Sequence, residues 1–260
     1  MWSLKSTSVK FSDRYDGRVP PSDDAEDSAR ARDEPAAATR RRPEFRKGRP
    51  TLTRERIARA ALGILAEAGP AEVTMRAVGA RLRVSPRALY NYVADRRDLL
   101  AEMVAVCQSD RPRPRLDPHR WPESLRAYCR ELRSWYRAHP GMPALARAED
   151  LTPFASSDLL RADDALVGFF LELGLSPRDA YRAWSVTVLQ VAGFAEIWDA
   201  VHDRPPFGLD PAGWTGVPPG TPAEALPHLR LLAAESAGEP PDALFESVLT
   251  MLVAGVRAML

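Results

Sequence analysis

Two side chains four residues apart, Arg87 and Asn91, have the chemistry needed to recognise bases in DNA. A guanidinium group can bond both acceptors of guanine, and a carboxamide can bond the donor and the acceptor of adenine. Tyr90 and Tyr92 flank Asn91 and have hydroxyl and ring groups that can reach phosphates or a thymine methyl group. Residues four apart share one face of a helix, so the segment 84–93 predicts a helix that reads DNA.

Capping signals divide the surrounding chain into short helices that would position these side chains. Thr74 can cap a helix that runs to about Leu82, and Ser85 followed by Pro86 can open the next one. Asp95 can cap a further helix. Two short helices joined by about three residues predict a helix-turn-helix, whose second helix enters the DNA major groove.

The same pattern predicts which side of the second helix faces DNA. Leu89 and Val93 are apolar and four apart, so they should face the core and leave Arg87 and Asn91 outward, with Ala88 and Tyr92 beside them. A scaffold helix ending at Gly69-Pro70 should supply that core. Its apolar face consists of Ile57, Ala61, Ile64, Leu65 and Ala68.

Charge along the chain supports a polyanionic partner. Residues 40–99 contain fifteen Arg or Lys against six Asp or Glu, whereas the rest of the chain has 21 basic and 29 acidic residues. A basic segment on an acidic chain is typical of DNA binding. The predicted helix N-termini at Thr74 and Ser85 add backbone N–H groups that can meet phosphates.

Composition divides the 260 residues into three parts. Residues 1–47 are polar and mix both charges, which predicts a disordered N-terminal extension. Residues 48–108 form the predicted helix-turn-helix domain, and three prolines within 109–118 mark a linker. Helical periodicity then continues through 119–260, interrupted by a Pro/Gly-rich stretch at 202–222. No strand pattern is found, so we expect an all-α protein with a C-terminal helical bundle.

Residues 49–104 closely resemble the DNA-binding domain of the TetR family of tetracycline-repressor-like regulators. The matching motifs are "RIARAALGILAEAG", "VTMRAVGARLRVS", "ALYNYV" and "DRRDLL". The resemblance implies base contacts by Arg76, Arg87, Asn91 and Tyr92, and backbone contacts by Thr74, Tyr90 and Arg96. It also implies a dimer on a palindromic operator, regulated by a small-molecule effector, with repression as the usual mode.

The C-terminal part contains features that fit this implied role. Aromatic residues on three predicted helices, with a few polar tips, suggest an effector pocket for a largely apolar ligand. Its predicted lining is Trp135, Tyr136, Phe170, Tyr181, Trp184, Gln190 and Phe194. The long apolar helices 177–201 and 241–259 each contain a close-packing pair, Ala192-Gly193 and Ala254-Gly255, and are the predicted homodimer interface.

Other functional classes lack their signatures. His119, His139, His202 and His228 lie in unrelated contexts, so no metal site is expected, and no cofactor or nucleophile motif marks an enzyme. The apolar runs are too short to span a membrane, and two cysteines without CxxC spacing fit a cytoplasmic protein. The alternative to a regulator is a nucleoid-type structural DNA-binding protein without an effector.

Overall fold

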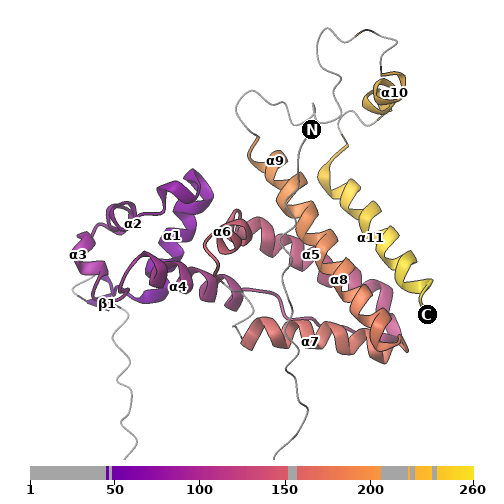
Figure 1. Cartoon of the computed structure of the whole chain (residues 1–260), viewed down its shortest axis with the longest axis horizontal. Coiled ribbons are helices and arrows are strands. Elements are labelled where there is room, and N and C mark those ends of the chain that lie inside the picture. Colours follow the sequence, from indigo (N-terminus) through magenta and orange to yellow (C-terminus); the bar gives the residue numbers. More distant parts are fainter. Residues whose placement is uncertain (1–44, 47–48, 152–156, 206–221, 223–225, 236–238) are drawn as a thin grey trace, which may run out of the picture. The chain divides into compact units, whose positions relative to one another are not determined.

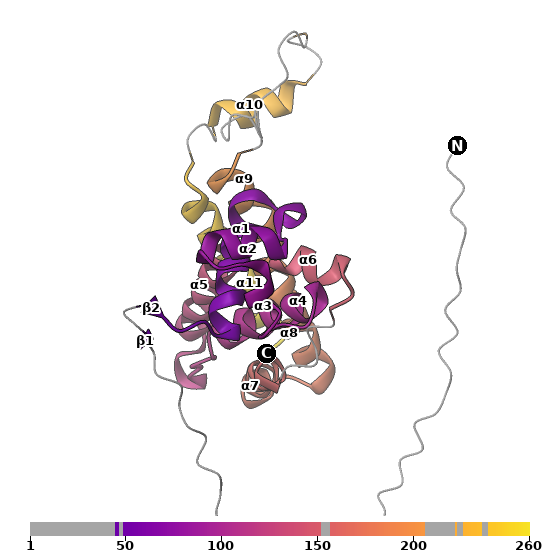
Figure 2. The same cartoon turned by 90° about the vertical axis from the view of Figure 1, so that its left-hand side faces the viewer.

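The computed structural model describes residues 45–46, 49–151, 157–205, 222, 226–235 and 239–260. Among these residues the elements are helices, apart from one short antiparallel pair of strands that Figure 2 shows side by side, β1 (Phe45–Arg46) and β2 (Arg49–Pro50). These strands were not predicted. Except for β1, the predicted extension 1–47 lies outside the described residues.

The N-terminal helices begin at the predicted caps (Figure 1). The side chains of Thr74, Ser85 and Asp95 each accept a hydrogen bond from a backbone N–H three residues ahead, at 3.1, 3.3 and 2.8 Å. These local bonds satisfy donors that have no partner inside the helix. The elements are α1 (Arg54–Ala68), the 3₁₀ turn η1 (Pro70–Glu72), α2 (Met75–Leu82), α3 (Pro86–Leu89) and α4 (Arg96–Ser109).

Helix α3 is shorter than the sequence pattern predicts. It ends at Leu89, and residues 90–92 form a turn in which the N–H of Tyr92 donates to the carbonyl of Leu89 at 2.8 Å. Tyr and Asn have low helix propensity, which favours an early end. Asn91 therefore follows the helix instead of lying on it.

The turn between α2 and α3 depends on the close approach of two backbone segments. The N–H of Val84 donates to the carbonyl of Gly79 at 2.9 Å, and a Cβ at position 79 would lie 2.9 Å from the carbonyl oxygen of Val84. Arg83 completes the turn with a left-handed backbone, at φ 56°. A side chain at position 79 would push the two helices apart.

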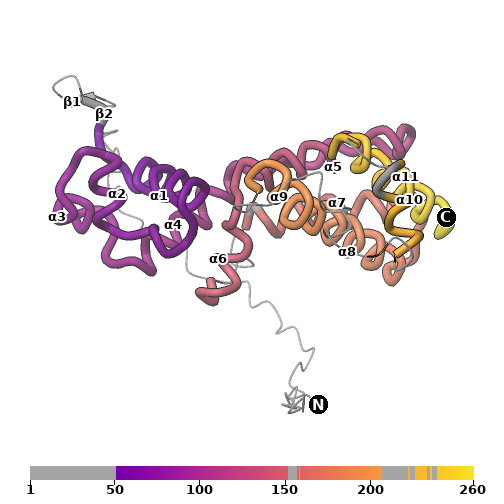
Figure 3. Tube along the Cα trace, turned by 90° about the horizontal axis from the view of Figure 1, so that it is seen from above, coloured from indigo at the N-terminus to yellow at the C-terminus, as the bar shows by residue number. Residues whose placement is uncertain are grey.

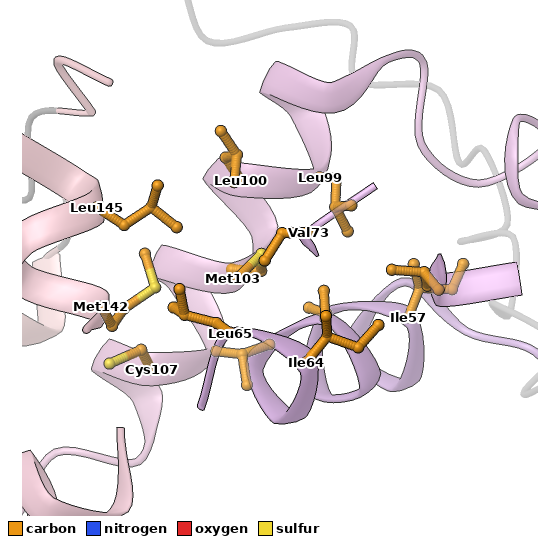
Figure 4. Packing of buried hydrophobic residues seen from close by; sticks show 14 of the residues in the cluster. Ile57, Ile64, Leu65, Val73, Leu99, Leu100, Met103, Cys107, Met142 and Leu145 are labelled. Carbon is orange, nitrogen blue, oxygen red and sulfur yellow. The ribbon is translucent and has the colours of Figure 1, made fainter. Parts of the chain in front are cut away.

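The first hydrophobic cluster extends beyond these four helices. In Figure 4, Met142 and Leu145 of α6 (Met142–Ala148) lie near Cys107 of α4 and Leu65 of α1. Helix α6 was not predicted, because it has seven residues and Pro143 in its first turn. It packs the chain that follows α5 against the helix-turn-helix.

A second hydrophobic cluster joins residues of the helices 121–138, 157–172, 177–193 and 241–257, whose backbones Figure 3 shows close together. Its core includes Leu132, Phe170 and Leu249. The helix predicted from residue 177 begins there, whereas α10 lies outside the helices that were predicted. The elements are η2 (Pro118–Arg120), α5 (Trp121–Ala138), α7 (Ser157–Glu172), α8 (Pro177–Gly193), the π-helix η4 (Phe194–Asp199), α9 (Ala200–Asp203), α10 (Pro227–Glu235) and α11 (Pro241–Arg257).

Trp135 of α5 packs against both clusters. Its indole N–H donates to the carbonyl of Cys107, near the end of α4, at 2.8 Å. This bond ties the second cluster to the helix that closes the first. The division into domains at 48–108 and 119–260 remains a prediction.

No helix in the described parts of the chain is both long enough and apolar enough to cross a membrane.

Candidate DNA-binding surface and effector pocket

The side chains predicted to read bases lie on the surface, over a buried anchor. Arg76, Arg87 and Asn91 are exposed, and Tyr90 is 53% exposed. Leu89 is fully buried and fixes the inner side of α3. Charged and amide groups are thus presented to solvent on a rigid support, which is what a major-groove reader requires.

Four other residues predicted to contact DNA also cap helices or lie partly buried within the protein. The hydroxyls of Thr74 and Ser85 are exposed but occupied as helix caps. Ala88 and Tyr92 are half-buried, and Tyr92 packs against the first hydrophobic cluster. Tyr92 can present only part of its ring to DNA in this arrangement.

Arg96, the predicted phosphate contact at the start of α4, is already bonded within the protein. Its Nη1 donates to Oε1 of Glu149, the C-cap of α6, at 2.8 Å. Both side chains are more than one-third exposed, so water screens the pair. DNA phosphates would compete with Glu149 for this guanidinium.

Arg54, which the sequence pattern did not single out, holds the turn that carries Asn91. Its guanidinium donates to both oxygens of Asp98, to Glu102 and to the carbonyl of Tyr92. The hydrogen bond from Arg54 lowers the pKa of Asp98. A basic residue at the start of a helix gives no local signal of this role, because its partners lie 38 to 48 residues away.

Five of the seven predicted effector-binding residues belong to the second cluster or pack against it, whereas Tyr181 and Gln190 do not. Phe170 is fully buried in the second cluster, and Trp135 lies between the clusters. Trp184 and Phe194 are half-buried, whereas Tyr181, at 63%, and Gln190 are exposed. Helix α8 is apolar on more than one side, so its spacing does not distinguish an inner face from an outer one.

A pocket of about 190 Å³ lies where the end of α5 and the start of α6 meet the π-helix η4 and α9. Of the seven predicted residues, Tyr136 is in its wall. Burial raises the pKa of the Tyr136 hydroxyl to about 12, so the phenol stays protonated. Glu196 also lines the pocket and was not predicted, because its place depends on the wide turn of the π-helix.

Buried polar groups also lie within the second cluster or near it. The guanidinium of Arg111 donates to Asp163 at 3.1 Å with its side chain 5% exposed. The hydroxyl of Tyr128 is buried and has no hydrogen-bond partner among the described residues, and burial raises its pKa. No group of three metal-ligating side chains gathers in the described residues.

Comparison with known proteins connects both halves of the chain to one family. Residues 57–103 match the family described as "Bacterial regulatory proteins, tetR family", and residues 113–260 match "Tetracyclin repressor-like, C-terminal domain". A curated relative, the HTH-type transcriptional repressor DrrR1 of Streptomyces coeruleorubidus, is 37% identical over 103 residues. That match covers 39% of this chain and 38% of the relative.

Solved structures share the fold over most of the chain. Apo ActR from Streptomyces coelicolor aligns with a TM-score of 0.59 at 27% identity, covering 80% of this chain and 95% of ActR. ActR in complex with actinorhodin aligns with a TM-score of 0.61 at 25% identity, covering 80% and 98%. The C-terminal match alone spans more than half of the chain, and it continues from a helix-turn-helix with the same family's pattern. The chain therefore belongs to the TetR family of bacterial regulatory proteins.

Proposed function

We propose that this protein is a transcriptional repressor that binds a palindromic operator in double-stranded DNA and leaves it when a small-molecule effector binds. The observation that carries the proposal is the exposed group of Arg76, Arg87 and Asn91, held over a buried core by capped helices. The relative DrrR1 is named as a repressor, and ActR has been solved with actinorhodin, which supports both halves of the proposal.

In this proposal Arg87 reads a base and Arg96 holds the phosphate backbone. Arg87→Ala should cost about 1–3 kcal/mol at the operator and relax the preference at one base pair. Arg96→Ala should weaken binding to all sequences alike. Fluorescence anisotropy with DNA from upstream of the protein's own gene, compared with random DNA, measures both. Equal losses on the two DNAs for Arg87→Ala would show that it reads no base.

The same titration separates a repressor from a nucleoid-type structural protein. A repressor should prefer its operator over random DNA by about 10³-fold or more. A structural protein should bind both within a few-fold, and no metabolite should release it. We infer that the protein binds DNA and an effector without catalysing a reaction. We also infer that it works in the cytoplasm, where the operator would be.

We also propose that the protein acts as a homodimer through α8 and α11. A helix-turn-helix reads few base pairs, so two copies about one DNA turn apart are needed for a specific site. Leu189 on α8 is 70% exposed, and Met251 on α11 is 65% exposed. On this arrangement Tyr181 and Gln190 belong to the subunit interface instead of the effector pocket. Ala254 and Gly255 are exposed, and a Cβ at Gly255 would meet nothing within 4 Å, which leaves room for a second helix.

The dimer is tested by placing a charge on the proposed interface. Leu189→Glu should shift the protein to monomer in sedimentation at micromolar concentration, because a carboxylate would lose its hydration there. Leu171→Glu is the matched control, since Leu171 on α7 is 43% exposed and outside the proposed interface. A wild-type protein that sediments as a monomer would rule out the dimer.

A further inference from the structure

The pocket at the corner between α5 and α6 has in its wall a carboxylate that the described residues satisfy only in part. Its walls include the side chains of Tyr136, Pro140, Ala144, Ala195 and Glu196. The buried Oε1 of Glu196 has no hydrogen-bond partner among the described residues. A buried carboxylate oxygen without a donor costs free energy, so turning this covered oxygen into the pocket to meet a bound hydrogen-bond donor would be favourable.

The other carboxylates of the pocket wall are already neutralised. Both oxygens of Asp199 accept hydrogen bonds from Arg133, at 2.6 and 2.7 Å. Both oxygens of Asp203 accept from Arg137, at 2.7 and 2.8 Å. Among the described residues of this wall, Glu196 is the carboxylate with an oxygen that accepts no hydrogen bond.

Glu196 has a guanidinium of its own, but the pair is incomplete. Its Oε2 accepts from Arg147 of α6 at 3.2 Å, and the Arg147 side chain is 67% exposed. Each carboxylate in the wall therefore has one arginine. Arg204 also lines the pocket, but it is exposed, so water screens its charge and it would stabilise an anion only weakly. A cationic ligand would find each carboxylate already paired, so neither kind of ion would recover the hydration that it loses.

We propose that this pocket binds a compact, uncharged ligand that places a ring or short apolar body beside Tyr136 and donates a hydrogen bond to Oε1 of Glu196. The donor is a hydroxyl or an amide N–H. A volume of about 190 Å³ is below the roughly 300–1,000 Å³ of pockets for drug-sized ligands, so the ligand is of single-ring size. The proposal rests on the proposed function in one respect, that the bound molecule acts as an effector.

Helix α6 connects this pocket with the DNA-binding surface. Arg147 of α6 bonds Glu196 at the pocket, and Glu149 at the end of α6 bonds Arg96 at the start of α4. Met142 and Leu145 place the same helix in the first hydrophobic cluster. A donor on Glu196 that weakens its bond to Arg147 changes how α6 is held, and a ligand that favours one position of α6 shifts the DNA-binding state.

The binding test uses four single-ring probes that differ in one group. These probes are p-cresol as a neutral donor, 4-methylanisole without a donor, benzylamine as a cation and benzoate as an anion. Calorimetric titration of the full-length protein without DNA should show p-cresol binding at least tenfold more tightly than the other three. Equal binding of 4-methylanisole would overturn the role of Glu196 as acceptor. Tighter binding of benzylamine or benzoate would overturn the uncharged class, and no binding of any probe at millimolar concentration would remove the site.

Variants assign the binding to the pocket. Glu196→Ala should weaken p-cresol binding at least tenfold and leave 4-methylanisole unchanged, whereas Glu196→Gln should lose less because its carbonyl still accepts. Glu172→Ala on the exposed end of α7 is the matched control and should bind as wild type. Undiminished p-cresol binding by both Glu196 variants, with unchanged thermal unfolding, would overturn the proposal.

Separate measurements distinguish failure of the pocket from failure of the proposed function. Operator binding is measured first without any probe, so its absence would contradict the repressor alone. Release of DNA by p-cresol in the wild type, lost in Glu196→Ala, would support the effector role of the pocket. Release that is equal in the wild type and Glu196→Ala would place the effector site elsewhere.

Discussion

The two hydrophobic clusters differ in where they keep their charged pairs. Around the helix-turn-helix, Arg54 and Asp98 pair with 43% and 30% of their side chains exposed. In the second cluster, Arg133 and Asp199 pair at 2.6 Å with 8% and 1% exposed. The guanidinium of Arg133 also lies over the ring of Phe245, 4.5 Å from its centre.

This difference matches what each region has to do. Exposed guanidinium groups keep their hydration and remain able to exchange a carboxylate for a DNA phosphate. A buried pair cannot exchange, because either ion left alone in the interior is costly. Charge is therefore adaptable around the helix-turn-helix, whereas the C-terminal bundle adds a fixed pair, Arg133 with Asp199, to its exposed ones.

The largest expected effect tests the fixed pair. Arg133→Ala should destabilise the protein by about 3–5 kcal/mol, because Asp199 would stay buried without its partner. Urea unfolding at neutral pH measures the loss. Arg137→Ala is the control, since this neighbour on α5 pairs with Asp203 while 38% exposed and should cost about 0–1 kcal/mol. Similar losses in both variants would contradict the contrast between buried and exposed pairs.

The two cysteines test how closely the clusters are packed. Burial raises the pKa of the Cys107 and Cys129 thiols from 9.0 to about 12. Between these values the unfolded thiols lose protons that the folded thiols keep, so stability falls as the pH rises from about 9 towards 12. At pH 10 each thiol should lower the free energy of unfolding by about 1.4 kcal/mol.

Urea unfolding at pH 8 and pH 10 measures this loss. The variants Cys107→Ala and Cys129→Ala should each lose less stability than wild type over this interval. Tyrosine ionisation stays the same in all three proteins, so it cancels from the comparison. If both variants lost as much as the wild type, the thiols would not be protected in the folded state.

Replacing Arg54 tests whether its exposed pair with Asp98 positions the turn at residues 90–92 for DNA binding. Arg54→Ala should weaken operator binding about tenfold, or about 1.4 kcal/mol, because the carbonyl of Tyr92 and Asp98 lose their common donor. The measurement is anisotropy with operator DNA. Arg59→Ala on the same helix is the matched control, since Arg59 makes a two-bond pair with Asp110 at the other end of α4. The idea fails if the two variants weaken binding to the same extent.

The smallest expected effect concerns Glu149. Glu149→Gln should raise affinity for any DNA by less than about 1 kcal/mol, because an exposed carboxylate no longer competes for Arg96. The slope of log affinity against log salt concentration should become more negative by about one, which corresponds to one added phosphate contact. In an Arg96→Ala background the same substitution should change nothing. A gain that persists there would show that Glu149 acts by general repulsion.

The helix-turn-helix could be predicted because its signals are local. Thr74, Ser85 and Asp95 each bond a backbone group three residues away, so the sequence contains both partners of every cap. The inward direction of Leu89 and Val93 follows from their spacing, and both are fully buried. The predicted length of α3 was wrong because the turn at residues 90–92 is held in part by Arg54, which is distant in sequence.

Local pattern thus determined that the chain is helical, where the DNA-reading helices begin, and which of their sides faces solvent, because caps and periodicity act within a few residues. Tertiary structure alone decided which face of α8 is covered, so Phe170 of α7 is buried against it while Gln190 of α8 is exposed. It also decided that Arg96 meets Glu149 and that Glu196 faces a pocket beside Tyr136. The physical reason is that the partners lie on different elements, as do Arg96 and Glu149, which are 53 positions apart, and helical spacing contains no information on which helix will lie opposite.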